Sequence, residues 1–218
     1  MAALEHELVP IELAFGETML IPRTPIDDLI FPASGLVSLM LELPDGKRVE
    51  VGIVGSETAV GLTALLGETR ASVRAVVQIP GHAYRIPVAA FAAQYEVSKG
   101  LRELVHRHAA AALLHVSINA ACNAVHPVEP RAARWLLAVQ DRVGETFPLT
   151  QEYMSAMIAA RRPVVNSVLS GFKAAGLIRH ARGWIAIADR GGLEAAACVC
   201  YRTDRERRDE LLGVHADR

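Results

Sequence analysis

The spacing of apolar residues changes abruptly near Tyr95, and this change constrains the fold of the 218-residue chain more than any other feature. Before it, runs such as "GLVSLMLEL" and "RVEVGIV" are separated by turn signals such as "PDGK", which predicts short β-strands. Residues 97–125 contain no proline, and their apolar positions recur every three or four residues, which predicts one long helix. Two prolines in "HPVEP", residues 126–130, then end that helix and start another. We therefore expect an α+β protein with a β-rich half, a long central helix and a second domain.

The β-rich half is expected to form a roll, because several short strands broken by Pro and Gly are typical of a sandwich or small barrel. We predict a jelly roll of the double-stranded β-helix, cupin-like type over residues 1–96, interrupted by a short helix and loop in "TAVGLTALLGETR". The dimerisation helix, residues 97–126, would follow, and residues 127–218 would form the second domain.

The long helix carries an apolar seam at a 3,4 spacing that is sustained for four heptads. Such a seam usually packs against a second helix, and the chain has no obvious long helical partner, so we expect a second copy of the chain. The alternative is that this face covers the roll; both could hold, because a second apolar stripe runs along Val105, Ala109, Ala112, Leu113 and Val116. The predicted seam consists of Leu101, Leu104, His108, Ala111, His115, Ile118, Cys122 and Val125.

The second domain reads as helix, helix, helix and strand pair, followed by a final helix in "GGLEAAACVCYRTDRERRDELLG". This order is typical of a winged helix-turn-helix. Between its second and third helices, the residue before Pro163 is pushed out of the helical region, so we expect Arg162 to be extended. Pro163 would then take the first position of the new helix, where its missing N–H costs nothing. One face of this helix is apolar and is expected to join the core: Val165, Val168, Leu169 and Phe172.

The outer face of the same helix suits the DNA major groove, because Arg pairs with guanine, Asn or Ser reaches base edges and Val meets a thymine methyl. Upstream, a threonine at the expected N-cap and the following glutamine would lie near phosphates, and two arginines flank the turn of the wing. The whole chain has a net charge of −1, but residues 150–187 hold five Lys/Arg against one Glu. This local excess favours DNA over a merely solvated turn. The predicted DNA-binding residues are Thr150, Gln151, Arg161, Arg162, Pro163, Val164, Asn166, Ser167, Lys173, Arg179 and Arg182.

The stretch "FPLTQEYMSAMIAARRPVVNSVLSGFKAAGLIRHARGWIAI" resembles the winged helix-turn-helix of the Crp/Fnr superfamily of bacterial transcription regulators, and "FPASGLVSLMLELPDGKRVEVGIVGSETAVGL" is similar to its cyclic-nucleotide-binding roll. The resemblance covers nearly the whole chain. It implies a homodimer that reads a two-fold symmetric DNA site, with an effector signal passed from the roll through the long helix. RNA polymerase would be a further partner of an activator. Many members carry a Glu where this chain has Pro163, so the DNA sequence that those members prefer cannot be assigned to this chain.

In members that bind cyclic AMP, a Gly-Glu pair holds the ribose hydroxyl and a later Arg-Ser or Arg-Thr pair holds the cyclic phosphate. The resemblance places the corresponding effector pocket at Gly61, Leu62, Thr69, Arg70 and Ser72 of this chain. Leu62 cannot accept the ribose hydrogen bonds, and each polar group left unpaired costs about 1–3 kcal/mol. We therefore expect an effector other than cyclic AMP, or none.

No cofactor or metal is expected. Relatives with an iron-sulfur cluster use several cysteines near the N-terminus, and here none precedes Cys122. Cys198 and Cys200 lie two residues apart, which on one helix points them to different faces and is not a CxxC spacing, so we interpret them as packing cysteines. His108 and His115 could face their copies in a pH-sensitive or metal-bridged seam, although polar residues tolerated at such positions are the simpler interpretation.

An enzyme is a weaker hypothesis, because the strands of the roll offer His82 alone as a cupin ligand and no GxSxG, P-loop, GxGxxG or HExxH motif is present. The other alternative is a ligand-binding or protein-interaction module with a cupin-like roll that binds no DNA. The acidic N-terminus lacks the pattern of a signal peptide, which predicts a cytoplasmic protein. The expected partners are thus double-stranded DNA and a second copy of the chain, and no membrane.

Overall fold

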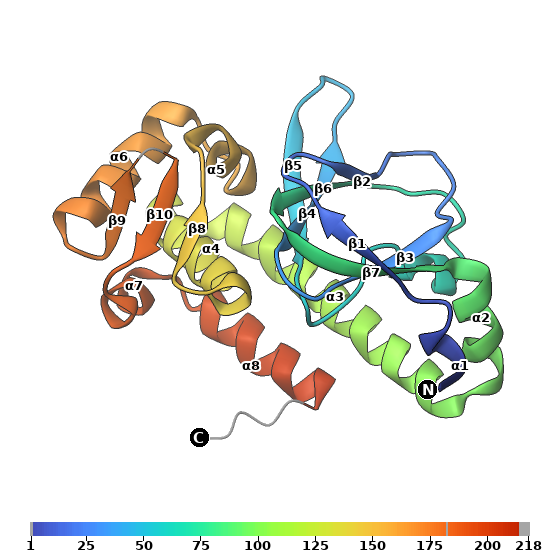
Figure 1. Ribbon diagram of the computed structural model, residues 1–218. Coiled ribbons are helices and arrows are strands. Elements are labelled where there is room, and N and C mark those ends of the chain that lie inside the picture. The colour runs from blue at the N-terminus through green and yellow to red at the C-terminus, as the bar shows by residue number, and fades with distance from the viewer. Residues whose placement is uncertain (1, 182, 214–218) are drawn as a thin grey trace.

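Two antiparallel sheets face each other in the N-terminal roll of the computed structural model, which describes residues 2–181 and 183–213. A short helix, α1 (Ala2–Glu5), precedes them. The first sheet has the order β1 (Val9–Leu13), β7 (Gly81–Pro87), β3 (Asp28–Pro32). The second has the order β2 (Thr18–Leu20), β6 (Arg74–Ile79), β4 (Leu36–Glu42), β5 (Arg48–Val54). This arrangement confirms the predicted roll (Figure 1).

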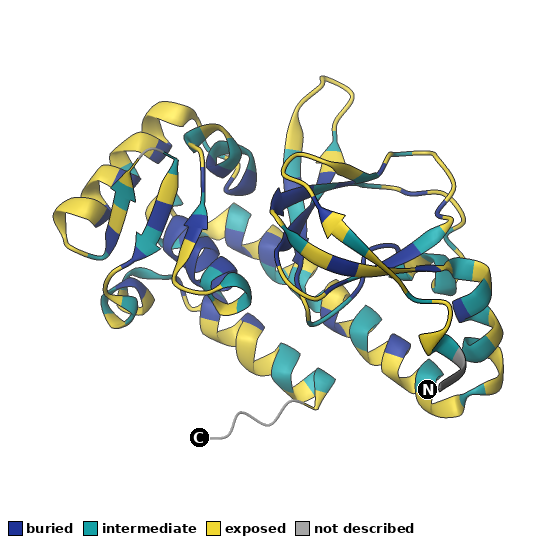
Figure 2. Cartoon of the chain, viewed as in Figure 1, coloured by how far each residue is buried: buried dark blue, intermediate teal, exposed yellow. Residues whose placement is uncertain are grey.

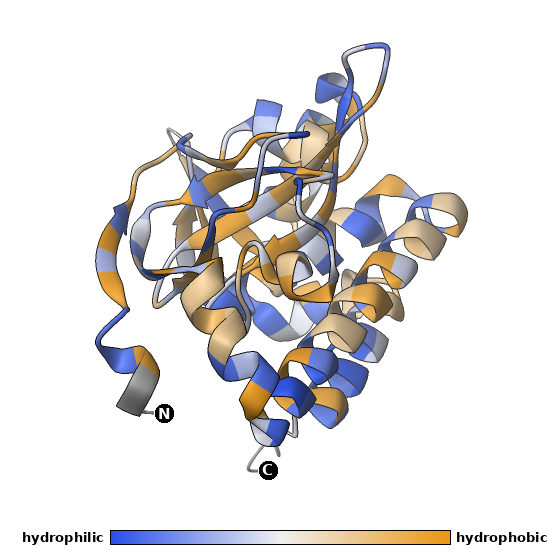
Figure 3. Ribbon diagram, turned by 90° about the vertical axis from the view of Figure 1, so that its right-hand side faces the viewer, coloured by the Kyte–Doolittle hydropathy of each residue, from blue (hydrophilic) through white to orange (hydrophobic). Residues whose placement is uncertain are grey.

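The predicted hairpin at "PDGK" joins β4 to β5. Gly46 adopts a left-handed φ of 81°, and Leu43 N donates to Lys47 O at 2.8 Å, so the glycine lets the chain reverse. The apolar positions of the strands point between the two sheets, where residues such as Val37 of β4 and Val77 of β6 are fully buried. Figure 3 shows apolar positions along the strands of the roll and along the long helix that follows.

Between β5 and β6 the chain forms one short 3₁₀ helix, η1 (Leu62–Leu66), where the sequence predicted a short helix and loop. The expected long helix is confirmed in position but is preceded by a separate helix, α2 (Val88–Val97). Ser98 divides the two and caps α3 (Lys99–Val125), because its side chain accepts a hydrogen bond from Leu101 N. Pro127 follows the end of α3, as expected.

The C-terminal domain packs three helices around a small sheet, which confirms the winged helix-turn-helix. Its sheet has the order β8 (Thr146–Pro148), β10 (Trp184–Ile187), β9 (Ile178–Ala181). The helices are α4 (Val128–Val143), α5 (Gln151–Met157) and α6 (Arg162–Ala174). Every residue of 131–139 is buried, so α4 is the central helix of this half (Figure 2).

The predicted single final helix is wrong. The chain forms α7 (Arg190–Ala196), turns at Ala197, whose backbone is extended (φ −74°, ψ 151°), and then forms α8 (Cys200–Leu212). α8 packs along α3, so the long helix has a helical partner within its own chain (Figure 1). None of the described helices combines the length and the hydropathy needed to cross a bilayer.

The roll and the C-terminal domain share one continuous apolar cluster. Met40 and Ile53 of the second sheet pack in the same cluster as Trp135 of α4 and Met157 of α5. Ser38 Oγ also lies 3.5 Å from Met157 Sδ, and Phe15 meets Tyr153 edge-on with ring centroids 5.3 Å apart. The two halves are therefore joined by packing as well as by the chain between them.

Candidate nucleic-acid interface and effector cavity

The turn between α5 and α6 is short and carries unusual backbone geometry. Thr150 caps α5, as predicted, because its Oγ1 accepts from Tyr153 N at 3.2 Å. Ala159 adopts a left-handed φ of 47°, which a residue with a Cβ rarely takes. The expected start of α6 was one residue late: Arg161 is the extended N-cap, and Arg162 is already helical, because Val165 N donates to Arg161 O. Pro163 still falls in the first turn, where its missing N–H leaves no bond unmade.

α6 separates an apolar face from a polar one. Val165, Leu169 and Phe172 are buried and Val168 is partly buried, which confirms the predicted core face. Val164 is 42% exposed on the opposite side. The other exposed side chains of this outer face are Arg161, Arg162, Pro163, Asn166, Ser167, Ser170 and Lys173.

Arg162 already has a partner. Its Nη2 lies 2.6 Å from Glu152 Oε2 of α5, and both side chains are more than half exposed. Gln151 is partly buried beside the N-cap, and Arg179 is exposed on β9 of the wing. Arg182, also predicted to meet DNA, lies outside the described residues. The structure thus brings a mainly basic and small polar surface onto one helix and its flanks.

A cavity of about 460 Å³ lies between the second sheet, η1, α3 and α8. Its wall is mainly aliphatic, with Leu39, Val60 and Leu62 from the roll and Leu212 from α8. Cavities of this size hold small organic ligands, and a mainly apolar lining favours an apolar body with few polar groups.

Some of the predicted effector residues line the cavity and others lie outside it. Gly61, Leu62 and Ser72 line it, but Thr69 and Arg70 do not. Arg70 Nη1 instead donates to Arg23 O at 2.8 Å. The prediction is therefore wrong in placing Arg70 and Thr69 in the pocket, because the loop that carries them pairs with the segment before β3.

Two polar features of the cavity oppose an anionic ligand near Ser72. The Ser72 hydroxyl donates to Glu68 Oε1, so a carboxylate occupies the position where a phosphate would accept that bond. Across the cavity, Arg142 Nε is bonded to Glu57 Oε1 at 2.7 Å. Burial acts to raise the pKa of Glu57, but the Arg142 guanidinium outweighs it and holds that pKa below its usual range. The Arg142 charge is therefore already neutralised by Glu57.

The predicted dimer seam on α3 is wrong in part. Ala111 and Cys122 are buried within the chain, Cys122 completely, and His115 faces α8, so none of the three lies on a free surface. Leu101 packs beside the core that α2 and α3 form with the roll. The apolar residues of α3 do share one helical face, but α8 and the roll cover much of that face. The remaining seam positions range from partly buried to exposed: Leu104, His108, Ile118 and Val125.

A chain of hydrogen bonds fixes His115 between three elements. Asn119 Nδ2 donates to Val51 O of β5 and to His115 Nε2, at 3.2 and 3.0 Å. His115 Nδ1 therefore carries the proton and donates to Asp204 Oδ2 of α8 at 2.9 Å. Burial acts to raise the pKa of Asp204, but the bond from His115 and nearby charges lower it. His115 thus serves as an intrachain tie.

An exposed apolar stripe of α3 includes part of the second stripe predicted from the sequence, of which Val105 is instead buried against the roll. Leu113 is 69% exposed and Val116 is 42% exposed, and the small side chains of Ala112 and Ala120 lie beside them in the helical repeat. Large apolar side chains in such a row are usually covered by a partner.

Sequence reasoning missed two polar groups that the fold assembles. Glu50 is fully buried, and its carboxylate accepts from Ser38 Oγ and from Trp135 Nε1 of α4, each at 2.8 Å. Burial raises the pKa of Glu50 to about 7 against the effect of those two bonds. The other group is a cluster of three thiols and one imidazole, Cys122, His126, Cys198 and Cys200. Two sequence signals pointed to it: the i, i+4 spacing of Cys122 and His126, and the Cys198–Cys200 pair that we interpreted as packing cysteines.

Comparison with known proteins matches each half of the chain to a known domain family. Residues 10–97 match the cyclic nucleotide-binding domain, and residues 130–196 match the Crp-like helix-turn-helix domain. The CRP-like cAMP-activated global transcriptional regulator of Mycobacterium tuberculosis is 27% identical to this chain over 191 residues, 82% of this chain and 84% of the relative.

Solved structures share the fold along nearly the whole chain. FixK2 from Bradyrhizobium japonicum superposes with a TM-score of 0.77 at 14% identity, covering 88% of this chain and 98% of its own. A CRP-family transcriptional regulator from Thermus thermophilus gives a TM-score of 0.72 at 23% identity, covering 86% of this chain and 96% of its own.

Proposed function

Because this chain belongs to the Crp/Fnr family of transcription regulators, we propose that it binds a two-fold symmetric site in duplex DNA as a homodimer. The observation that carries this proposal is the outer face of α6, where Arg161 and Arg162 begin a helix whose exposed side chains are small, polar or basic. If the regulator activates transcription, RNA polymerase is its further partner, and these contacts would take place in the cytoplasm.

The residues divide into two roles on the DNA. Arg161, Arg162, Val164 and Ser167 lie at the start and on the outer face of α6, where a recognition helix meets base edges. Thr150 and Arg179 flank that helix at the cap of α5 and on the wing, where backbone contacts position the protein. Gln151, Pro163, Asn166, Lys173 and Arg182 complete the proposed set.

The exposed stripe of α3 supports the proposed homodimer. Leu113 and Val116 would meet their copies across a two-fold axis, and Ala112 and Ala120 would let the two helices approach closely. This assignment moves the proposed interface from the predicted seam to the neighbouring stripe of the same helix.

We infer that the effector, if there is one, is not cyclic AMP but a more apolar molecule. The relative from Mycobacterium tuberculosis is named as cAMP-activated. In this chain Leu62 stands in place of the ribose-binding acid. Arg70 donates a hydrogen bond to a backbone carbonyl outside the cavity, and the Ser72 hydroxyl already donates to the carboxylate of Glu68. A mainly aliphatic cavity favours a ligand with a large apolar surface.

Selection of duplexes from a random library by the purified protein tests the DNA proposal. The expected product is a palindromic site whose half-sites lie about 10 base pairs apart or a multiple of that. Affinity for the selected duplex should fall steeply with salt, because phosphate contacts release counterions. Failure to enrich any sequence, combined with a flat salt dependence, would favour the protein-interaction module instead.

A further inference from the structure

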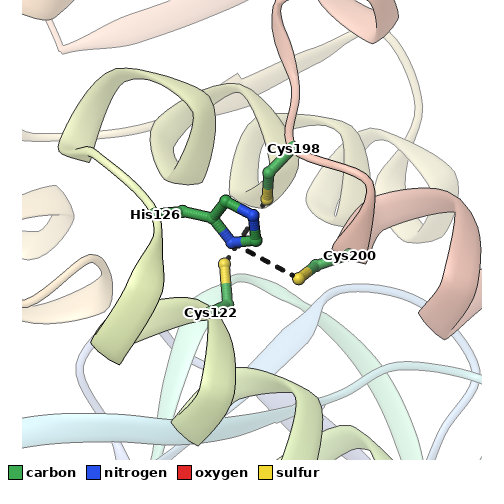
Figure 4. Close-up of side chains that lie close together, drawn as sticks. All are labelled: Cys122, His126, Cys198 and Cys200. Carbon is green, nitrogen blue, oxygen red and sulfur yellow. Dashed lines mark hydrogen bonds between the residues drawn. The ribbon is translucent and has the colours of Figure 1, made fainter.

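All three cysteines of the chain converge on one histidine. Cys122 and His126 lie one turn apart at the C-terminal end of α3, and Cys198 and Cys200 lie at the junction of α7 and α8. Their four donor atoms all lie within 4.8 Å of one another (Figure 4). Two segments separated by more than 70 residues in the sequence thus present three sulfurs and one ring nitrogen to a common point.

We propose that these four side chains form a tetrahedral site for a thiophilic divalent cation, zinc in particular. Three thiolates and an imidazole are one of the donor sets of closed structural zinc sites. This proposal does not depend on DNA binding, because it concerns the joint between α3 and α8 rather than the surface of α6.

The distances between the donors fit such an ion. In a tetrahedral zinc site, sulfurs lie about 3.8 Å apart and a sulfur and a nitrogen about 3.5 Å apart, as follows from Zn–S of about 2.3 Å and Zn–N of about 2.0 Å. Cys200 Sγ lies 3.6 Å from His126 Nδ1, and Cys122 Sγ lies 3.4 Å from Cys198 Sγ. Small rotations of the side chains would close the remaining differences.

The backbone explains why the donors converge. His126 caps α3, and its N–H donates to Cys122 O at 3.0 Å, while Pro127 keeps the next residue out of the helix. On the other side, Cys198 N reaches Pro130 O at 3.4 Å, which ties the break between α7 and α8 to the start of α4. Because Cys198 stands outside both helices, it and Cys200 can face the same point, which a continuous helix would prevent.

A buried arginine supplies the second observation. Arg134 of α4 is 6% exposed, and its Nε has no hydrogen-bond partner within the described part of the chain. Its guanidinium lies near enough to all three thiols for its charge to act on each of them. Zinc with three thiolates and a neutral imidazole carries a net charge of −1, and this anion would balance the Arg134 charge.

A disulfide explains less of this arrangement. A bond between Cys122 and Cys198 would use two of the three thiols and would leave Cys200 and His126 without a role. A metal ion uses all four side chains and closes a site of which two donors are buried and two are partly buried. Occupied, the site would fasten the end of α3 to the start of α8.

The test begins with the wild-type protein, purified under reducing conditions without a histidine tag from cells supplied with zinc. We expect about one zinc per chain by elemental analysis, and release of that zinc as a mercurial reagent titrates the three thiols. Replacement by Co²⁺ should give the intense red-region d–d absorption of a tetrahedral site and a near-ultraviolet thiolate-to-cobalt band. A chain that holds no stoichiometric metal, or that forms a Cys122–Cys198 disulfide under these conditions, overturns the proposal.

Variants identify the ligands. Cys200→Ser and His126→Ala should each weaken Co²⁺ binding by about 100-fold or more, because loss of a ligand exceeds the 10- to 100-fold effect of losing a supporting contact. His82→Ala, at an exposed histidine on β7, is the matched control and should bind as wild type does. Equal cobalt affinity and spectra in all four proteins would place the metal elsewhere. Circular dichroism checks that each variant is folded. The zinc release from wild type tests the proposal even if a variant does not fold.

Discussion

Trp135 Nε1 donates a 2.8 Å hydrogen bond to Glu50 Oε1, and this bond connects the central helix of the DNA-binding domain to the second sheet of the roll. Both residues are buried, and Ser38 Oγ completes the contact from β4. Ser38 Oγ donates to Glu50 Oε2 and also lies 3.5 Å from Met157 Sδ of α5, so the hydroxyl contacts both domains. The contact between the roll and the DNA-binding domain therefore contains a buried carboxyl group whose pKa burial raises to about 7.

Glu50 makes stability depend on pH. Its pKa is about 7 in the folded chain and 4.5 in an unfolded one, so between these values the folded state binds the extra proton and stability falls as pH rises. We expect the free energy of unfolding to drop by about 2–3 kcal/mol from pH 5 to pH 8 through this group alone. Urea unfolding of Glu50→Gln should lack that drop. Glu12→Gln, at an exposed position on β1, should keep it; a Glu50→Gln profile that parallels wild type would contradict the assignment.

Removing both arginines at the start of α6 should abolish sequence-specific binding. A bidentate contact to a base discriminates by about 1–3 kcal/mol, so Arg161→Ala/Arg162→Ala should bind the selected site at least about 30-fold more weakly. Fluorescence anisotropy on matched and scrambled duplexes measures the loss. Arg202→Ala removes an exposed arginine of α8, which pairs with Glu206, and serves as the control. Unchanged discrimination in the double variant would exclude α6 as the reading helix.

Glu152 should lower the affinity of the protein for DNA. Its carboxylate holds Arg162 in the free protein, and it adds a negative charge beside the proposed DNA surface. We expect Glu152→Gln to raise affinity for the selected duplex about 2- to 5-fold, the range of an exposed ion pair, and most clearly at low salt. The same anisotropy assay measures it, with Glu206→Gln on α8 as the control. A weaker complex would show that Glu152 instead positions Arg162 for DNA.

The stripe on α3 predicts the oligomeric state. Leu113→Glu places a charge where two copies would meet, and each copy also loses the burial of a leucine, worth about 1.5–3 kcal/mol. Sedimentation at micromolar concentration should then find a monomer where wild type is a dimer. Val97→Glu changes an equally exposed apolar residue at the end of α2 and should leave the dimer intact. A dimer that survives Leu113→Glu would place the interface elsewhere.

Cyclic AMP should not stabilise the protein. A ligand present at 100 times its Kd raises the free energy of unfolding by about 2.7 kcal/mol, which a thermal shift assay resolves readily. We expect no shift with cyclic AMP, because Leu62 and the Glu68–Ser72 pair offer its ribose and phosphate no partners. A hydrophobic fluorescent probe should bind the aliphatic cavity and serve as the positive control. A saturable shift with cyclic AMP would refute the proposed exclusion.

The fold was largely predictable because its signals are local. Alternating runs, the proline-free stretch that became α3 and the Arg-Arg-Pro turn each determine structure within a few residues. The face of α6 followed from the same periodicity, since Val165 and Leu169 leave Val164 outside.

The remaining features depend on contacts that no local pattern encodes. A helical period shows that Ala111 and Cys122 share a face, but not that α8 returns to cover it. The convergence of Cys122 and Cys198 depends on a helix break in "AAACVC", where neither proline nor glycine marks the end of α7. Burial of Glu50 required knowing that the DNA-binding domain closes over that strand.

The return of α8 to α3 also has a consequence for biosynthesis. His115 meets Asp204 across 89 positions of sequence, so α3 leaves the ribosome long before its partner helix exists. During that interval the roll can fold, but the part of α3 that α8 covers, Cys122 included, stays exposed. The roll and α8 together cover this face, so its packing cannot be completed until α8 has left the ribosome.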